Sequence, residues 1–258
     1  MTGALLPPGG RPLLLRLTPQ ATGVFLLAGA AWAVTIGQAV RMGNGPGTMG
    51  LGMAEFFGMW TLMMAAMMLP SVAPMASLYS RTVQSARAWR LATFTAGYLI
   101  VWAAAGLPAY ALLRASGALA PAHPTVARAS AAGLLAVAGG WQLSGAKDRC
   151  LAHCRSPISV LLRYASYRGI LRDLKASIHH ASFCLGCCWM LMALFAVFGV
   201  MNIAAMIVLA LIVLLEKLWS HGTGFSRAVG VTSLILALAA LFAPSLTPGL
   251  HQHAPMHM

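Results

Sequence analysis

The chain has 258 residues, of which 59% are hydrophobic and 8% are charged, and its formal net charge is +13. A soluble globular domain carries about a quarter charged residues, so this composition excludes an ordinary soluble fold and indicates a protein embedded in a lipid bilayer. The basic residues are confined to short segments between apolar runs, which argues against a nucleic-acid partner despite a pI of about 10.6. The chain has only four acidic residues, which are Glu55, Asp148, Asp173 and Glu216.

Seven apolar runs approach the length of a membrane-spanning helix, which needs roughly 20 apolar residues. They lie near residues 20–40, 54–75, 91–113, 125–145, 179–200, 202–219 and 228–246. The fifth and sixth runs meet around Met201 and Asn202, and because together they are too long for one span we expect a tight helical hairpin there. The sequence predicts an all-α fold, a polytopic transmembrane bundle of about seven spans over residues 20–246. A cytoplasmic segment (1–19) precedes it and an external tail (247–258) follows it.

The loops predict the orientation of the bundle. With the N-terminus inside, the cytoplasmic segments hold fourteen of the seventeen Lys and Arg residues, and the other three are Arg41, Arg114 and Arg128. This positive-inside bias predicts a bacterial inner-membrane protein with its N-terminus in the cytoplasm and its C-terminus outside. Residues 156–175 mix apolar and charged residues, a pattern typical of an amphipathic helix on the membrane surface. Alternatively the first run is a cleavable signal peptide, with Arg11 and Arg16 before it, which leaves six spans.

The stretch 183-FCLGCCWMLM-192 places three of the five cysteines inside an expected span. Cys184, Cys187 and Cys188 follow the i, i+3, i+4 spacing of one helix face, and His180 extends that face by one turn. Thiolates and imidazoles are ligands for copper(I), with zinc or an iron–sulfur cluster as alternatives. One cysteine alone would be interpreted as a small apolar core residue, but three within five residues beside a histidine favour a metal site.

Methionines are concentrated in the second expected span. Seven of the sixteen fall within residues 53–75, and Met59, Met63 and Met67 repeat every four residues, so that thioethers line one side of a helix. Methionine is also ordinary packing material. Because this span runs from outside to inside, Met63 and Met67 are expected at the depth of the cysteine cluster. Thioether and thiolate together form a soft ligand set that suits copper(I).

A second cysteine pair lies in 147-KDRCLAHCRSP-157 on the expected cytoplasmic side. If this segment is helical, Cys150 and Cys154 share a face. The neighbouring basic residues favour thiolates, and that environment suits metal transfer and thiol chemistry equally. Because the cytoplasm is reducing, we do not expect structural disulfides.

Two further groups are candidate ligands. Glu216 lies in the last turn of the sixth expected span, where the helix dipole disfavours an anion, so it needs a metal or a cation. Arg227 and the surface helix are better candidates for that cation than the adjacent Lys217. The tail 251-HQHAPMHM-258 holds His251, His253 and His257, and a tract of this kind outside the membrane suits metal capture.

The chain resembles a bacterial and archaeal family of predicted metal-binding integral membrane proteins that carries a CLGCCW-type motif. The matching pieces are MWTLMMAAMMLPS at 59–71, CRSP at 154–157, FCLGCCWMLM at 183–192, GVMN at 199–202 and LLEKLW at 214–219. The family commonly has a His-Gly pair shortly before its cysteines, where this chain reads 179-HHASFC-184 and lacks the glycine. The resemblance implies metal binding, without a substrate or a mechanism.

Together these patterns predict an integral membrane protein that binds a transition metal, with copper(I) placed before other metals. It would act in copper transport, storage or delivery, and its protein partner would be a metallochaperone or a cuproenzyme. One alternative is a membrane thiol–disulfide oxidoreductase that uses Cys184 and Cys187 with Cys150 and Cys154 as a relay. The other is a non-catalytic membrane subunit or assembly scaffold. An enzymatic role is the less favoured of these readings.

Overall fold

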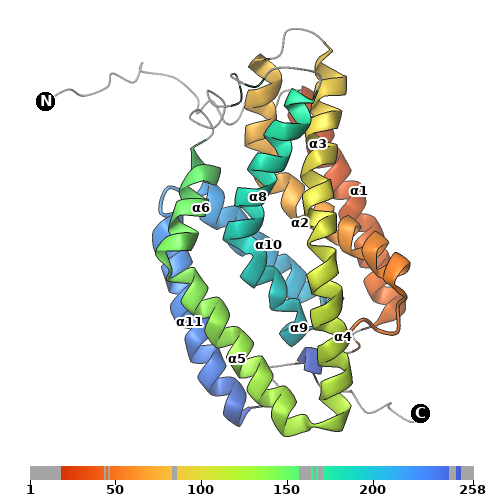
Figure 1. Cartoon of the computed structure of the whole chain (residues 1–258), viewed down its shortest axis with the longest axis vertical. Coiled ribbons are helices and arrows are strands. Elements are labelled where there is room, and N and C mark those ends of the chain that lie inside the picture. The colour runs from red at the N-terminus through yellow and green to blue at the C-terminus, as the bar shows by residue number, and fades with distance from the viewer. Residues whose placement is uncertain are drawn as a thin grey trace, which may run out of the picture.

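The computed structural model describes residues 19–43, 45, 47–82, 86–156, 164, 167, 171–243 and 248–250. Over these residues the chain is helical and has no strand, so the expected all-α bundle is confirmed (Figure 1). In chain order the elements are α1 (Pro19–Met42), α2 (Met53–Thr82), α3 (Arg87–Ala104), α4 (Gly106–Ala122), α5 (Pro124–Gln142), α6 (Gly145–Arg155), α8 (Arg172–Ala193), α9 (Phe195–Phe198), α10 (Ile203–Leu218), α11 (Gly222–Phe242) and the 3-10 turn η3 (Pro248–Leu250).

Five stretches of the described chain are long and apolar enough to cross a membrane. They are Thr22–Met42, Met53–Tyr79, Arg87–Ala122, Arg172–Phe198 and Gly222–Phe242, and the third of them combines α3 and α4. Two of the seven expected runs, 125–145 and 202–219, are present as the helices α5 and α10. Neither helix is among the five stretches that are long and apolar enough to cross a membrane. α10 has 16 residues, fewer than the roughly 20 that a simple span needs.

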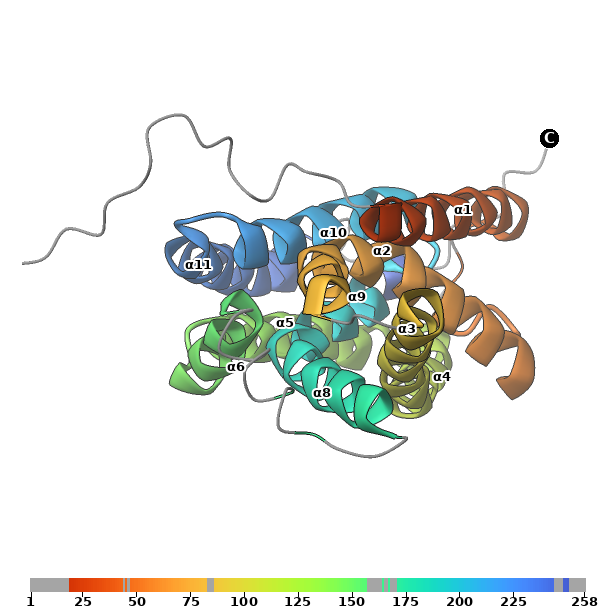
Figure 2. The ribbon, with the colours of Figure 1, turned by 90° about the horizontal axis from the view of Figure 1, so that it is seen from above.

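Helix α2 forms the centre of the bundle. Figure 2 shows it between a side formed by α1 and α10 and a side formed by α3 and α4. Most of its length is buried, in keeping with a sequence that is apolar on nearly all sides. The indole nitrogen of Trp60 donates to the carbonyl oxygen of Trp102 at 3.0 Å, which ties α2 to α3. All the methionines of α2 except Met53, at its first position, therefore lie inside the protein.

The chain reverses between α9 and α10, where the hairpin was expected. Gly199 has a φ of +92°, a conformation that other residues rarely adopt. The side chain of Asn202 then caps α10 by accepting a hydrogen bond from the amide of Ala205 at 3.2 Å. The C-terminal end of α10 lies beside the middle of α8, where the ammonium of Lys217 contacts the Cys184 sulfur.

An ion pair fixes three helix ends to one another. Arg90, in the first turn of α3, contacts Asp173, in the first turn of α8, with its Nη2 2.6 Å from Oδ1 and its Nε 2.9 Å from Oδ2. The hydroxyl of Tyr79, near the end of α2, donates to the same carboxylate. A paired, hydrogen-bonded arginine–carboxylate contact of this kind is stronger and more directional than a simple charge pair.

Some expectations fall on residues that are not described. The amphipathic helix expected over 156–175 lies mostly outside the described residues, and from Arg172 onward the chain already belongs to α8. The segment 1–18 and the tail with His251, His253 and His257 also lie outside them.

Candidate metal centre

One face of α8 carries the three clustered cysteines into the core. The Cys184, Cys187 and Cys188 side chains are each 1% exposed or less, and His180 is 4% exposed. The sulfur atoms of Cys187 and Cys188 lie 3.2 Å apart. The Cys187 thiol also donates to the Cys184 carbonyl oxygen at 3.1 Å. The helical spacing seen in the sequence therefore gathers the thiols into one buried cluster.

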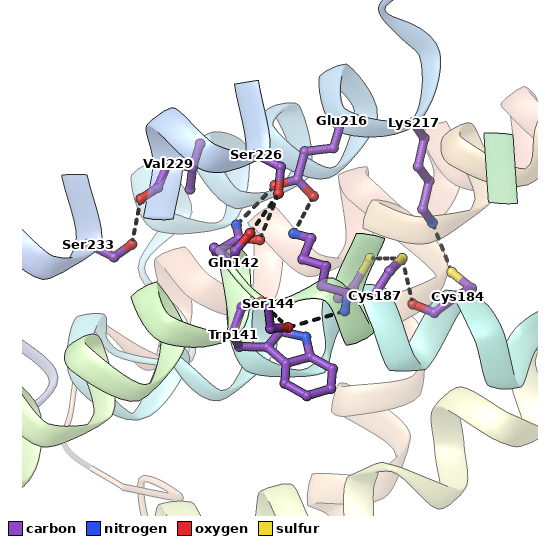
Figure 3. A network of polar contacts seen from close by, with 12 residues as sticks. Trp141, Gln142, Ser144, Cys184, Cys187, Glu216, Lys217, Ser226, Val229 and Ser233 are labelled. Carbon is purple, nitrogen blue, oxygen red and sulfur yellow. Dashed lines mark hydrogen bonds and ion pairs between the residues drawn. The ribbon is translucent and has the colours of Figure 1, made fainter. Parts of the chain in front are cut away.

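Cys184 is the most polar point of this cluster. Lys217 of α10 donates from Nζ to the Cys184 sulfur at 2.9 Å (Figure 3). The same ammonium donates to the Ser71 hydroxyl of α2 at 3.0 Å. On α3, the Tyr98 hydroxyl lies 2.9 Å from the same sulfur. An ammonium beside a sulfur atom stabilises its thiolate. Three helices, α3, α8 and α10, thus meet at this sulfur atom, and α2 joins them through the contact of Ser71 with Lys217.

Sequence reasoning missed this role of Lys217, because it considered the residue only as a poor partner for the adjacent Glu216. Consecutive residues of a helix point about 100° apart, so the two side chains enter different parts of the core. The available signal was the lysine itself, since an ionisable residue in an apolar helix is a candidate functional group in its own right.

Glu216 belongs to a separate buried network, shown in Figure 3. The ammonium of Lys147 on α6 lies 2.7 Å from Oε2 of Glu216, and Gln142 donates to Oε1 at 2.9 Å. The expectation that Arg227 neutralises Glu216 was wrong, and the surface helix expected as the other source lies mostly outside the described residues. Arg227 lies 3.4 Å from Asp148 instead. The first turn of α6 packs against the end of α10, which brings Lys147 to Glu216 and keeps both charges out of water.

Helix α6 brings the second cysteine pair against the first. Cys150 and Cys154 are partly exposed, and both pack on the core. A Cβ atom added at Gly186 would lie 3.0 Å from the Cys150 sulfur, so the glycine permits the close approach of α6 to α8. Cys154 lies one helical turn further along α6, on the face that carries Cys150. The two cysteine motifs, separate in the sequence, therefore lie on neighbouring helices, one pair partly exposed and the other group in the core.

The methionines of α2 are buried beside this region. Met59, Met63 and Met67 are 5% exposed or less. Ser71 marks the face of α2 that meets Lys217, and by helical spacing Met67 shares that face, whereas Met59 points about 120° away. Met64 and Met68, which are also four residues apart, share the face as well. Met67 also borders a groove of about 350 Å³ between α1, α2 and α10.

His180 has an unusual environment for a buried histidine. Its Nδ1 atom is buried and has no hydrogen-bond partner among the described residues. Its ring lies 6.4 Å, centroid to centroid, from the ring of Tyr98, the residue that contacts Cys184. Buried polar atoms are nearly always paired, and an exception calls for an explanation such as a bound ion.

No group of three or more His, Cys, Asp and Glu side chains in the described part of the chain is arranged to hold a metal ion. Cys184 is engaged by Lys217, and the sulfur atoms of Cys187 and Cys188 lie against each other. A metal must therefore replace sulfur contacts that the protein makes with itself.

A comparison with known families identifies the kind of protein. A family model described as PpoB2, copper chaperone, matches residues 57–240. The chain belongs to this copper chaperone family. The matched residues run from the start of α2 almost to the end of α11, so they include every residue of the thiol cluster and its surroundings. The expectation of a metal-binding family is confirmed at this level. No curated protein and no solved structure matches the chain.

Proposed function

We propose that this chain is a membrane-embedded copper(I) chaperone that holds the ion among the thiols of α8 and passes it to a cuproenzyme during assembly. The observation that carries the proposal is the fully buried cluster of Cys184, Cys187 and Cys188, with an ammonium and a phenol directed at one of its sulfur atoms. Thiolates are soft ligands that select copper(I). The copper chaperone family supports copper as the cargo.

The surrounding side chains suit a soft ion. The unpartnered Nδ1 of His180 offers a neutral nitrogen ligand one helical turn from Cys184. Met67 and its neighbours Met64 and Met68 offer neutral thioethers from α2. Neutral ligands add no charge to the apolar interior, where unpaired charges are costly. Glu216 is not part of the proposed ligand set, since both of its carboxylate oxygens already have partners.

The neighbouring thiols of α6 and α8 supply a route for the ion. Cys150 and Cys154 are partly exposed on α6, and the Cys150 sulfur lies against Gly186, between Cys184 and Cys187 of α8. Copper(I) moves between such sites by ligand exchange, in which an incoming thiolate binds before an outgoing one leaves. We therefore assign storage to the α8 thiols and exchange with a protein partner to the α6 thiols.

The experiment is metal analysis after anaerobic purification in detergent from copper-supplemented cells. The wild-type chain is expected to retain copper stoichiometrically, and Cys187→Ser and Cys188→Ser are expected to lose it. The matched control is Cys150→Ser, the same substitution on α6, which should retain copper but release it more slowly to a thiol acceptor. A wild-type chain without copper, or one that shows quinone- or thiol-dependent turnover without metal, would favour the oxidoreductase alternative.

A further inference from the structure

The surface around α6 carries positive charge that the acids of the chain do not neutralise. The whole chain has four acidic residues. Three of them form ion pairs within the described residues, namely Asp148 with Arg227, Asp173 with Arg90 and Glu216 with Lys147. The fourth, Glu55, lies in the first turn of α2 and accepts a hydrogen bond from the amide of Gly52. No acid of the described chain is therefore left for the two arginines of α6.

These two arginines, Arg149 and Arg155, are held by backbone oxygen atoms instead. The exposed Arg149 donates to the carbonyl oxygen of Gly145 at 3.2 Å. The partly exposed Arg155 donates to the carbonyl oxygens of Glu216 and Ser220 at 2.7 and 2.9 Å. These contacts use only some of the N–H donors of each guanidinium and add no negative charge. Both side chains are thus fixed in place with their charge unbalanced over the described residues.

The ends of α10 and α11 extend this surface (Figure 1). Ser220, which Arg155 contacts, follows Trp219, whose side chain is 47% exposed. At the other end of α6, Asp148 pairs with Arg227 of α11, whose side chain is 65% exposed. Three arginines against one aspartate leave the area positive. We call it the α6 surface, and it consists of Arg149, Arg155, Arg227 and Trp219.

The residue types of the α6 surface indicate what it contacts. Arginine and tryptophan are the residues enriched at the centres of protein–protein interfaces. A guanidinium that is already held in place can bind a carboxylate through two parallel hydrogen bonds. Anionic lipid is bound by larger clusters of basic side chains. The surface therefore fits carboxylates of a protein better than lipid phosphates. It also borders Cys150 and Cys154, the partly exposed thiols on the same helix.

We propose that the α6 surface docks an acidic face of the protein that exchanges copper(I) with this chain. Carboxylates of the partner pair with Arg149 and Arg155, and its metal ligands then reach Cys150 and Cys154. This inference rests on the proposed function for the identity of the cargo. It adds the place at which the partner binds and the charge of the partner's surface. Complementary charge of this kind raises the rate of encounter and fixes the orientation of the partner.

The first measurement is the binding of two fluorescent peptides of equal length, an oligoglutamate and an oligolysine, to the full chain without metal. The chain is held in a non-ionic detergent at about 0.1 M salt, where exposed charges more than about 10 Å apart are largely screened. Fluorescence anisotropy gives the affinities. Wild type is expected to bind the oligoglutamate about tenfold more tightly than the oligolysine.

The variants locate the binding surface. Arg149→Glu should weaken oligoglutamate binding by about tenfold, because it replaces an attractive charge by a repulsive one. Arg149→Lys should keep most of the affinity. The matched control is Arg87→Glu, the same change at an exposed position of α3, which should bind the peptide as wild type does.

A second measurement connects the surface with copper transfer. The acceptor is the oligoglutamate with a Cys-x-x-Cys pair added, mixed with the copper(I)-loaded chain. Arg149→Glu should transfer copper to it about tenfold more slowly than Arg87→Glu does. Equal transfer rates in these two variants would overturn the inference.

The binding outcomes decide the remaining alternatives. Equal affinity of wild type for the two peptides overturns the inference. Equal effects of Arg149→Glu and Arg87→Glu also overturn it, since they would show a response to net charge alone. If the oligoglutamate preference persists in phosphatidylcholine bilayers but is lost in bilayers with phosphatidylglycerol, anionic lipid occupies the surface and the inference fails. A wild-type chain that retains no copper contradicts the proposed function, and the peptide affinities still decide whether an acidic partner docks here.

Discussion

Lys147 and Glu216 form an ion pair whose Nζ and Oε2 atoms lie 2.7 Å apart with both side chains 1% exposed or less. The pair joins the first turn of α6 to the last turn of α10. Arg155, at the other end of α6, reinforces the junction by donating to the Glu216 carbonyl oxygen at 2.7 Å. The partly exposed thiols of α6 are therefore held against α8 by contacts that involve no sulfur atom.

This pair predicts the effect of Glu216→Gln. The substitution leaves the buried Lys147 ammonium without a counter-charge, and the free energy of unfolding should fall by about 3–5 kcal/mol. The double variant Lys147→Met/Glu216→Gln removes both charges and should recover most of that loss. Thermal unfolding of the purified chains in detergent measures both effects. If Glu216→Gln is as stable as wild type but fails to transfer copper, Glu216 acts on the metal rather than on the fold.

The close approach of α6 to α8 depends on Gly186. Gly186→Ala places a methyl group 3.0 Å from the Cys150 sulfur, so α6 should move outward and the transfer of copper to a thiol acceptor should slow. Copper retention by the α8 thiols should persist. The control is Gly140→Ala on α5, where an added Cβ meets nothing within 4 Å. Stopped-flow transfer to a chelating thiol tests the prediction, and equal rates in the two variants would show that α6 takes no part in exchange.

The histidine-rich tail gives a prediction that is separable from the core. Deletion of residues 251–258 should reduce copper accumulation by cells at low external copper, because His and Met tracts capture metal ions. The fold should be unaffected, since the tail has no apolar face to bury. The measurement is cellular copper at a series of external concentrations, with the thermal stability of the purified chain as the control. An unchanged accumulation curve would leave the tail without a role in capture.

The parts of the fold that follow from local periodicity could be predicted from the sequence. The buried face that carries Cys184, Cys187 and Cys188 follows from the 3.6-residue repeat of one helix. The reversal before α10 follows from a turn with Gly199 and Asn202 between two apolar runs. These features depend only on neighbours in the chain.

The contacts between distant segments could not be predicted in this way. Lys217 and Cys184 are 33 residues apart, and Lys147 and Glu216 are 69 residues apart. Each pairing depends on which helices pack together and on the depth at which their side chains meet. The local pattern of one segment reveals neither of these. The same limit explains why Arg227 was preferred as the partner of Glu216, and why the two cysteine motifs were not placed against each other. Gly186, between Cys184 and Cys187, was a local indication of a close helix contact.

The central claim is that copper(I) is bound by the thiols of α8. X-ray absorption at the copper edge, on anaerobically purified wild type and Cys184→Ser, tests it most directly. We predict copper(I) in the wild type with sulfur as the principal ligand atom, and loss of most of the copper in Cys184→Ser. Copper bound mainly by nitrogen and oxygen, at equal amounts in the two proteins, would contradict the claim.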